Sequence, residues 1–204
     1  MRINHFSKMR FVDFFKTNVV FIFYYLLFLI SFLIGSLAVI FNFSFVNTDI
    51  VLNFIDFIIN FDIWTVFKQC VTFTGLILTI IYLLSFYSFG SPIIVFVFTA
   101  VSYFIGLLFT IICKEFGLAG LLFNSLSLIL PVLIVLIILT LISSASISYS
   151  TNIVRFIFNN KNVIDIKQKT TDLFVLYLIL IFVTSLNSLL FAFLTTFLDK
   201  IITN

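Results

Sequence analysis

The sequence predicts an all-α membrane protein, built as a five-helix transmembrane bundle with one amphipathic interfacial helix on the outer side. Composition is the first observation behind this prediction. Hydrophobic residues make up 63% of the 204 residues and charged residues only 9%, with a mean hydropathy of +1.32, which is more apolar surface than a soluble domain of this length can bury. The second is a series of long apolar segments with no Gly/Ser-rich linker between them, so residues 1–204 are expected to form a single integral membrane domain.

Five segments are long and apolar enough to cross the bilayer, at about 18–41, 70–88, 92–112, 118–142 and 173–198. At ~1.5 Å per residue each reaches across the ~30 Å hydrocarbon core, the second only just. Helices are expected because backbone polar groups in lipid must be satisfied within their own segment. The first segment is longer than the apolar core of a signal peptide and no small-residue cleavage site follows it, which predicts an uncleaved anchor.

The distribution of Lys and Arg predicts the orientation. Five spans place the N-terminal arm and the connector at about 143–171 on the same side, and eight cations lie there: Arg2, Lys8, Arg10, Lys16, Arg155, Lys161, Lys167 and Lys169. Three remain for the other side: Lys68, Lys114 and Lys200. The positive-inside rule therefore predicts a multi-pass membrane protein with a cytoplasmic N-terminus and an external C-terminus.

The segment at about 47–67, between the first two spans, has one polar stripe on an otherwise apolar pattern. The stripe recurs at steps of four, three and four residues, as on one face of a helix: Asp49, Asn53, Asp56 and Asn60. Such a helix is expected to lie in the outer interface with Trp64 as an aromatic anchor. It either rests on the membrane or forms a docking ridge for an external partner.

Residues that could support catalysis are scarce. His5 is the only histidine, and the interiors of the five spans contain no Asp, Glu, Lys or Arg. We therefore expect no enzyme activity, metal, cofactor or small-molecule substrate, and an ion-coupled transporter is disfavoured because intramembrane charges usually mark such proteins. No basic stripe indicates a nucleic-acid partner. Cys70 and Cys113 are expected near the outer ends of neighbouring spans, where a disulfide and two free thiols are both compatible with the sequence.

Residues 113–131 interrupt the apolar pattern with polar side chains, glycines and a proline. Lys114 and Glu115 are expected to form the outer turn between the third and fourth spans. Gly117 and Gly120 would then open the fourth span with a surface small enough for close helix contact.

Pro131 is expected to kink the fourth span, because it lacks the N–H of an i to i−4 hydrogen bond and clashes with the carbonyl of Ser127. Asn124 and Ser127 lie within two turns and can re-satisfy the freed backbone. Asn187, the other deep amide, is expected to bond with Asn124 or Ser127. This pattern favours a shape-holding role over a substrate site.

Pairs of small residues four apart predict close helix packing in four spans. The pairs are Ser31 with Gly35, Gly75 with Thr79, Ser102 with Gly106, and Thr184 with Ser188. A compact bundle is expected from them.

Two motifs resemble the stage II sporulation protein M family of bacterial membrane proteins. "FGLAGLLFNSLSLILP" (116–131) is similar to the glycine-containing run that opens that family's fourth span and ends at a proline, and "FGSPIIVF" (89–96) is similar to the entry to its preceding span. The family commonly has a Gln-Asn pair after the proline, whereas here Val132 and Leu133 follow. The five spans and the outer amphipathic segment agree with its layout.

The resemblance implies a non-catalytic scaffold that gathers peptidoglycan-degrading enzymes, the stage II sporulation proteins D and P, at the septum during engulfment in sporulation. Partners of this chain would be cell-wall hydrolases resembling those two proteins, docked at the stripe of residues 49–60, besides the lipid bilayer itself. The alternative is a membrane subunit of a transporter or flippase, with Pro131, Asn124 and Asn187 lining a path.

Overall fold

The computed structural model describes residues 11–41, 62–159 and 163–202. In this part of the chain five helices are long and apolar enough to cross a membrane, which confirms the predicted all-α transmembrane bundle. A five-residue π-helical turn joins two of the helices. The elements in chain order are α1 (Phe11–Ile40), α3 (Ile63–Leu84), α4 (Gly90–Phe123), η1 (Asn124–Leu128), α5 (Ile129–Asn159) and α6 (Val163–Ile202).

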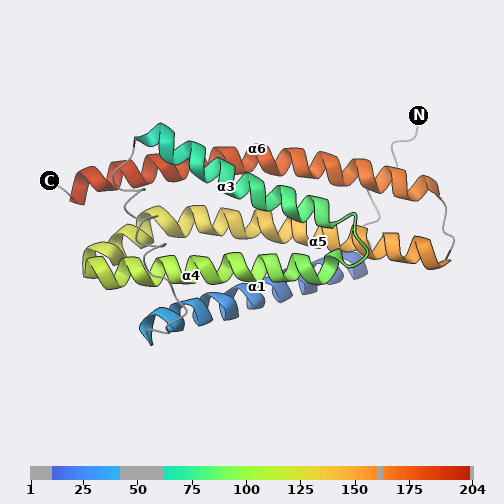
Figure 1. Cartoon of the computed structure of the whole chain (residues 1–204), viewed down its shortest axis with the longest axis horizontal. Helices are drawn as coiled ribbons and strands as arrows, with labels where there is room; N and C mark the ends of the chain where they lie inside the picture. The colour runs from blue at the N-terminus through green and yellow to red at the C-terminus, as the bar shows by residue number, and fades with distance from the viewer. Residues whose placement is uncertain (1–10, 42–61, 160–162, 203–204) are drawn as a thin grey trace.

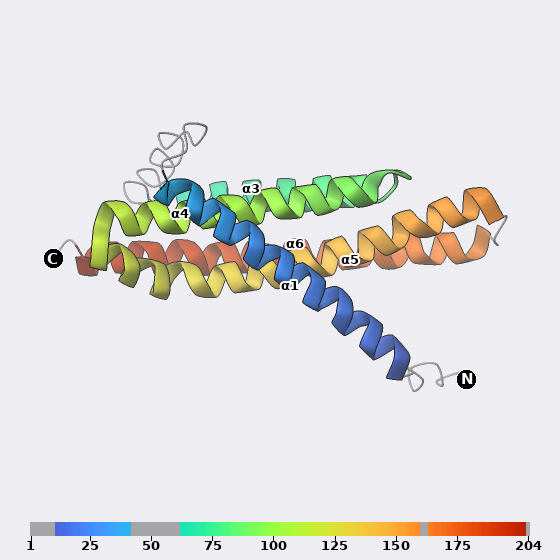
Figure 2. The same ribbon diagram turned by 90° about the horizontal axis from the view of Figure 1, so that it is seen from below.

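The helices form two layers. α3 and α4 lie together in one layer, α5 and α6 in the other, and α1 crosses the bundle obliquely with its main contact on α4 (Figures 1 and 2). The start of α1, the α3–α4 turn and the α5–α6 turn lie at one end, called here the N-terminal end. The end of α1, the start of α3, the end of α6 and the reversal of the chain within α4 lie at the opposite end (Figure 1).

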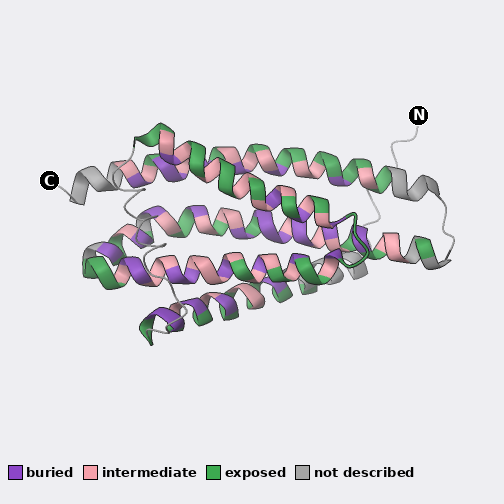
Figure 3. Ribbon diagram, in the orientation of Figure 1, coloured by how far each residue is buried: buried purple, intermediate pink, exposed green. Residues whose placement is uncertain are grey.

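Burial separates the two environments of the bundle. Buried, intermediate and exposed residues alternate along the helices (Figure 3). The largest core cluster joins all five helices, with Tyr24, Leu78, Phe98, Ile142 and Leu180 among its members. Large apolar side chains dominate the exposed surface of every helix, as expected where hydrocarbon rather than water is the solvent.

The second span lies closer to the N-terminus than predicted. α3 begins at Ile63, after the extended N-cap residue Asp62, and ends at Leu84, whereas the sequence predicted 70–88. The helix ends there because the chain turns: the Tyr87 amide donates to the Leu84 carbonyl at 3.1 Å. The final residues of the predicted interfacial segment, including Trp64, therefore belong to a spanning helix. The stripe of Asp49, Asn53, Asp56 and Asn60 lies outside the described residues.

The connector predicted at 143–171 is helical in its described residues and continues α5 and α6. Its run of Ser, Thr and Asn does not end α5, because these side chains bond to carbonyls of their own helix. The Ser144 hydroxyl donates to the Leu141 carbonyl at 2.9 Å, and the Asn152 amide donates to the Ser148 carbonyl at 2.6 Å. The two helices consequently project beyond the α3–α4 turn (Figure 2). We call this projection, residues 151–159 and 163–172, the arm.

Two glycines allow α1 and α4 to cross at backbone distance. A methyl group on Gly35 would overlap the Tyr103 carbonyl oxygen, and one on Gly106 would overlap the Phe32 carbonyl oxygen. The Ser36 hydroxyl donates to the Gly106 carbonyl at 3.4 Å across the same contact. The packing predicted from small residues is therefore confirmed at this crossing. It is wrong for Gly75, which has no atom within 4 Å of the position of an added Cβ.

Candidate functional site

The chain reverses direction at a single glycine within the range of α4, where two helical segments meet. Gly117 has a φ of 56° and a ψ of −127°, a conformation that residues with a Cβ rarely adopt. The turn thus falls at Gly117 and not at the predicted Lys114–Glu115, which are still helical. Gly117 serves the turn and makes no close helix contact. Gly120 does make the close helix contact that was predicted for both glycines, since a methyl group there would overlap the Ile112 carbonyl oxygen.

The helix after this turn is irregular just before Pro131. Residues Asn124–Leu128 form the π-helical turn η1, which is the expected response to a proline that cannot donate to the carbonyl four residues earlier. Ser127 is fully buried and its hydroxyl donates to the Phe123 carbonyl at 2.6 Å. The predicted distortion is present, and it takes the form of a widened turn.

The two deep amides hold different contacts from those predicted. The Asn124 amide nitrogen donates to the Phe109 carbonyl at 2.9 Å and to the Cys113 sulfur at 3.1 Å, both on α4. The Asn187 amide nitrogen donates to the Pro131 carbonyl at 3.2 Å. Asn187 therefore bonds neither Asn124 nor Ser127, because the backbone of the proline-containing segment is the nearer acceptor. The two amides pin η1 and the start of α5 to α4 on one side and to α6 on the other.

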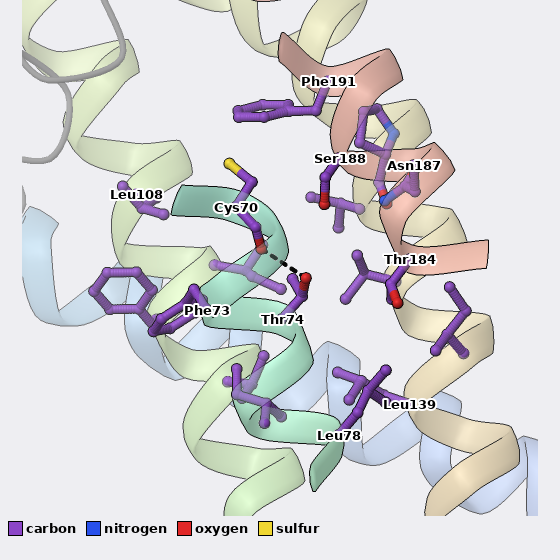
Figure 4. Close-up of a pocket in the computed structure, with 18 of the residues that line it drawn as sticks. Cys70, Phe73, Thr74, Leu78, Leu108, Leu139, Thr184, Asn187, Ser188 and Phe191 are labelled. Carbon is purple, nitrogen blue, oxygen red and sulfur yellow. Dashed lines mark hydrogen bonds between the residues drawn. The ribbon is translucent and has the colours of Figure 1, made fainter. Parts of the chain in front are cut away.

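A cavity of about 400 Å³ lies between the two layers of the bundle, and we refer to it below as the cavity. α3, α4, α5 and α6 all contribute to its wall (Figure 4). Its lining is almost wholly apolar, and lining residues on α3 and α6 include Cys70, Phe73, Thr74, Thr184, Asn187 and Ser188. Thr184 and Ser188 were predicted to pack helices closely. Here their small side chains face the cavity and leave room for it.

Three polar side chains of the wall donate hydrogen bonds to backbone carbonyls. The Thr74 hydroxyl donates to the Cys70 carbonyl at 2.6 Å, and the Thr184 hydroxyl donates to the Leu180 carbonyl at 2.7 Å. The Asn187 amide nitrogen is bonded to the Pro131 carbonyl, as described above, and the buried Oδ1 of the same side chain has no hydrogen-bond partner among the described residues. The cavity therefore presents a surface suited to hydrocarbon rather than to ions or polar solutes.

The two cysteines are free thiols. Cys70 lines the cavity and Cys113 accepts the hydrogen bond from Asn124, so each has a different environment. Among the described residues, no group of three His, Cys, Asp or Glu side chains is placed to hold a metal ion.

The sequence prediction found the deep amides and Pro131 but missed the cavity. One signal was available: Thr74, Ala100, Thr184 and Ser188 are small residues in the middle of three spans. Their arrangement around one space depends on how the helices are rotated, which spacing along the chain does not give. Comparison with known proteins found no family model, no curated protein and no solved structure that matches this chain.

Proposed function

We propose that this chain is a non-catalytic membrane scaffold that anchors and localises partner proteins in the bacterial cytoplasmic membrane. The observation that supports it best is the arm, a helical hairpin that continues past the α3–α4 turn (Figure 2). Thr151 on α5 and Lys169 and Asp172 on α6 are exposed there. α6 is 40 residues long, about 60 Å at the helical rise and twice the ~30 Å hydrocarbon core, so the hairpin supplies surface for protein contact outside the lipid.

The proposed partners on the external side are peptidoglycan-degrading enzymes, the class implied by the resemblance to the stage II sporulation protein M family. In this proposal they dock on the polar stripe of residues 49–60, and wall hydrolysis in septal remodelling and engulfment belongs to them. The arm lies at the opposite end of the bundle, where it contacts cytoplasmic proteins. The scaffold thus links the two faces of the membrane through a bundle fixed by backbone-close helix contacts.

A pull-down from native membranes in mild detergent, with mass spectrometry of the bound proteins, tests this proposal. One variant replaces the stripe: Asp49→Ala, Asn53→Ala, Asp56→Ala and Asn60→Ala. A matched variant replaces exposed polar residues of the arm: Thr151→Ala, Lys169→Ala and Asp172→Ala.

We expect wild type and the arm variant to retain cell-wall hydrolases and the stripe variant to lose them. The reverse pattern would move the hydrolase dock to the arm. If no hydrolase is recovered with the wild type at the level of a specific partner, the scaffold proposal is wrong.

A membrane subunit of a transporter or flippase is the second candidate, and the cavity is the observation that favours it. Its apolar wall at membrane depth fits a lipid-like cargo better than a polar one. In the same pull-down this candidate predicts an ATPase or another permease as the main specific partner, and no hydrolase.

A further inference from the structure

Among the described residues, the exposed part of the cavity lining lies on α3 and α4. Four of its lining residues are exposed, and all four belong to these two helices: Gln69, Phe73, Phe96 and Ala100. Phe73 and Phe96 are 52% and 71% exposed. Every lining residue on α5 and α6 is buried or half-buried. The layer of α3 and α4 therefore carries the mouth, and the layer of α5 and α6 forms the floor.

The gap between α3 and α6 is closed by direct contacts. The Thr79 and Tyr177 hydroxyls share a hydrogen bond at 2.8 Å, and the Tyr82 and Tyr177 rings stack with their centroids 4.5 Å apart. Nearer the start of α3, the buried Val66 packs with Phe191 and Ala192 of α6. The exposed lining residues therefore favour entry between α3 and α4 over entry between α3 and α6.

The mouth faces hydrocarbon. The lining residues of α3 and α4 fall inside the apolar spans Ile63–Leu84 and Gly90–Leu118. Molecules that reach the mouth from the side therefore arrive through the lipid core, where water and ions are scarce. Bilayer lipids are the most abundant molecules at this depth.

The dimensions of the cavity suit a hydrocarbon chain. Its lining on α4 runs from Phe96 to Leu108, about 18 Å at the helical rise, which exceeds half of the ~30 Å hydrocarbon core and so the depth of one leaflet. The volume of about 400 Å³ falls in the range of sites that enclose small molecules. Because the lining is almost wholly apolar, recognition would come from apolar contact and shape.

We propose that the cavity is a lipid-binding site that holds one acyl chain of a bilayer phospholipid, entering between α3 and α4 and lying along the floor of α5 and α6. The bound chain fills the space between the two layers and stabilises their separation. This inference requires neither the scaffold nor the transporter function, since a resident lipid is compatible with both.

Photolabelling of the purified full-length protein in phospholipid vesicles tests the site. The vesicles contain phosphatidylethanolamine, phosphatidylglycerol and a small fraction of a phospholipid with a diazirine midway along one acyl chain. Adducts are mapped to residues by mass spectrometry. Val132 and Val135 report the floor, and Leu133 on the same helix, 49% exposed, reports the outer surface.

We expect label on both floor residues and on Leu133 in the wild type. Ala100→Trp fills the mouth and should remove the floor label while Leu133 keeps its label. Leu76→Trp places the same side chain on the lipid-facing surface of α3, where Leu76 is 56% exposed, and should leave both labels unchanged. Ala100→Leu introduces a smaller side chain at the same position and should also remove the floor label. It serves as the test if Ala100→Trp does not fold.

Two results would overturn the proposal: an unlabelled floor in the wild type, or floor label that persists in both Ala100 variants. A parallel sample carries the diazirine on a polyprenyl phosphate instead. Floor label from that probe in excess of the phospholipid label would replace the assigned occupant with an isoprenoid lipid. The pull-down described above reads out partners and is independent of these labels.

Discussion

Three glycines of this chain show how differently one residue type acts inside a membrane bundle. Gly106 lets the α1 and α4 backbones touch, Gly117 permits a turn that other residues resist, and Gly75 has open space around it. The environment of each glycine, and not its type, therefore decides the effect of a substitution.

Gly106→Ala is expected to destabilise the fold by about 1–3 kcal/mol, the usual cost of overpacking, because the new methyl group collides with the fixed Phe32 carbonyl. Gly75→Ala is the matched control. It should be neutral or stabilise by up to ~1 kcal/mol, since alanine favours helix and meets no neighbour. Unfolding by a graded addition of denaturing detergent measures both free energies. Equal effects of the two changes would contradict the close α1–α4 crossing.

The residue-scale predictions from sequence succeeded where chemistry alone decides the outcome. Pro131 distorts its helix because of its missing N–H, which can be known from sequence. The hydrogen-bond partners of Asn124 and Asn187 could not be predicted from sequence, because the acceptors are the backbone carbonyls of Phe109 and Pro131. Which carbonyl lies within reach depends on the rotation and depth of the neighbouring helices.

At the scale of elements, α5 is held to the α3–α4 turn by one fully buried side chain. The Ser150 hydroxyl donates to the Tyr87 carbonyl at 2.7 Å. Nearby, Tyr149 shares a hydrogen bond of 2.6 Å with Thr170 of α6 and packs edge-on against Phe86. The base of the arm is thus fixed to both layers.

Ser150→Ala should cost about 1 kcal/mol, because it leaves the Tyr87 carbonyl without this donor. Hydrogen exchange at residues 85–90 is expected to rise as the turn loosens. Ser144→Ala is the control, since the Ser144 hydroxyl bonds only within its own helix, to the Leu141 carbonyl. Unchanged exchange in the Ser150 variant would show that the turn does not depend on this bond.

Hydropathy predicted all five spanning helices but not where they end. The serine-rich stretch after residue 142 appeared in the sequence as a polar connector, yet its hydroxyls bond back to helix carbonyls and the helix continues. Likewise the apolar residues after Asp62 joined α3 instead of an interfacial helix. Helix ends depend on local hydrogen bonds that an averaged hydropathy does not resolve.

At the scale of the whole molecule, five spans put the first residue of α1 and the last of α6 at opposite ends of the bundle (Figure 1). The start of α1 and the α5–α6 turn share one end, as the positive-inside prediction requires of the two basic segments. Which side of the membrane this end faces stays a prediction, and labelling across the membrane tests it.

Single cysteines introduced in a Cys70→Ala, Cys113→Ala background give that test. Asn204→Cys at the C-terminus is expected to react with a membrane-impermeant maleimide in intact cells. Asn160→Cys, which follows α5 among the basic residues, should react only after permeabilisation. The opposite pattern of labelling would invert the topology and place the arm outside the cell.

The single-glycine reversal at Gly117 also bears on how the protein enters the membrane. No polar loop separates the two helical segments of α4 that meet at Gly117, and Lys114 and Glu115 lie just before this turn. If the first segment were inserted alone, the connection to the next segment would be too short for that segment to insert in a later step. The two should therefore leave the translocation machinery together as a hairpin, with the charged pair carried across the bilayer at its leading edge.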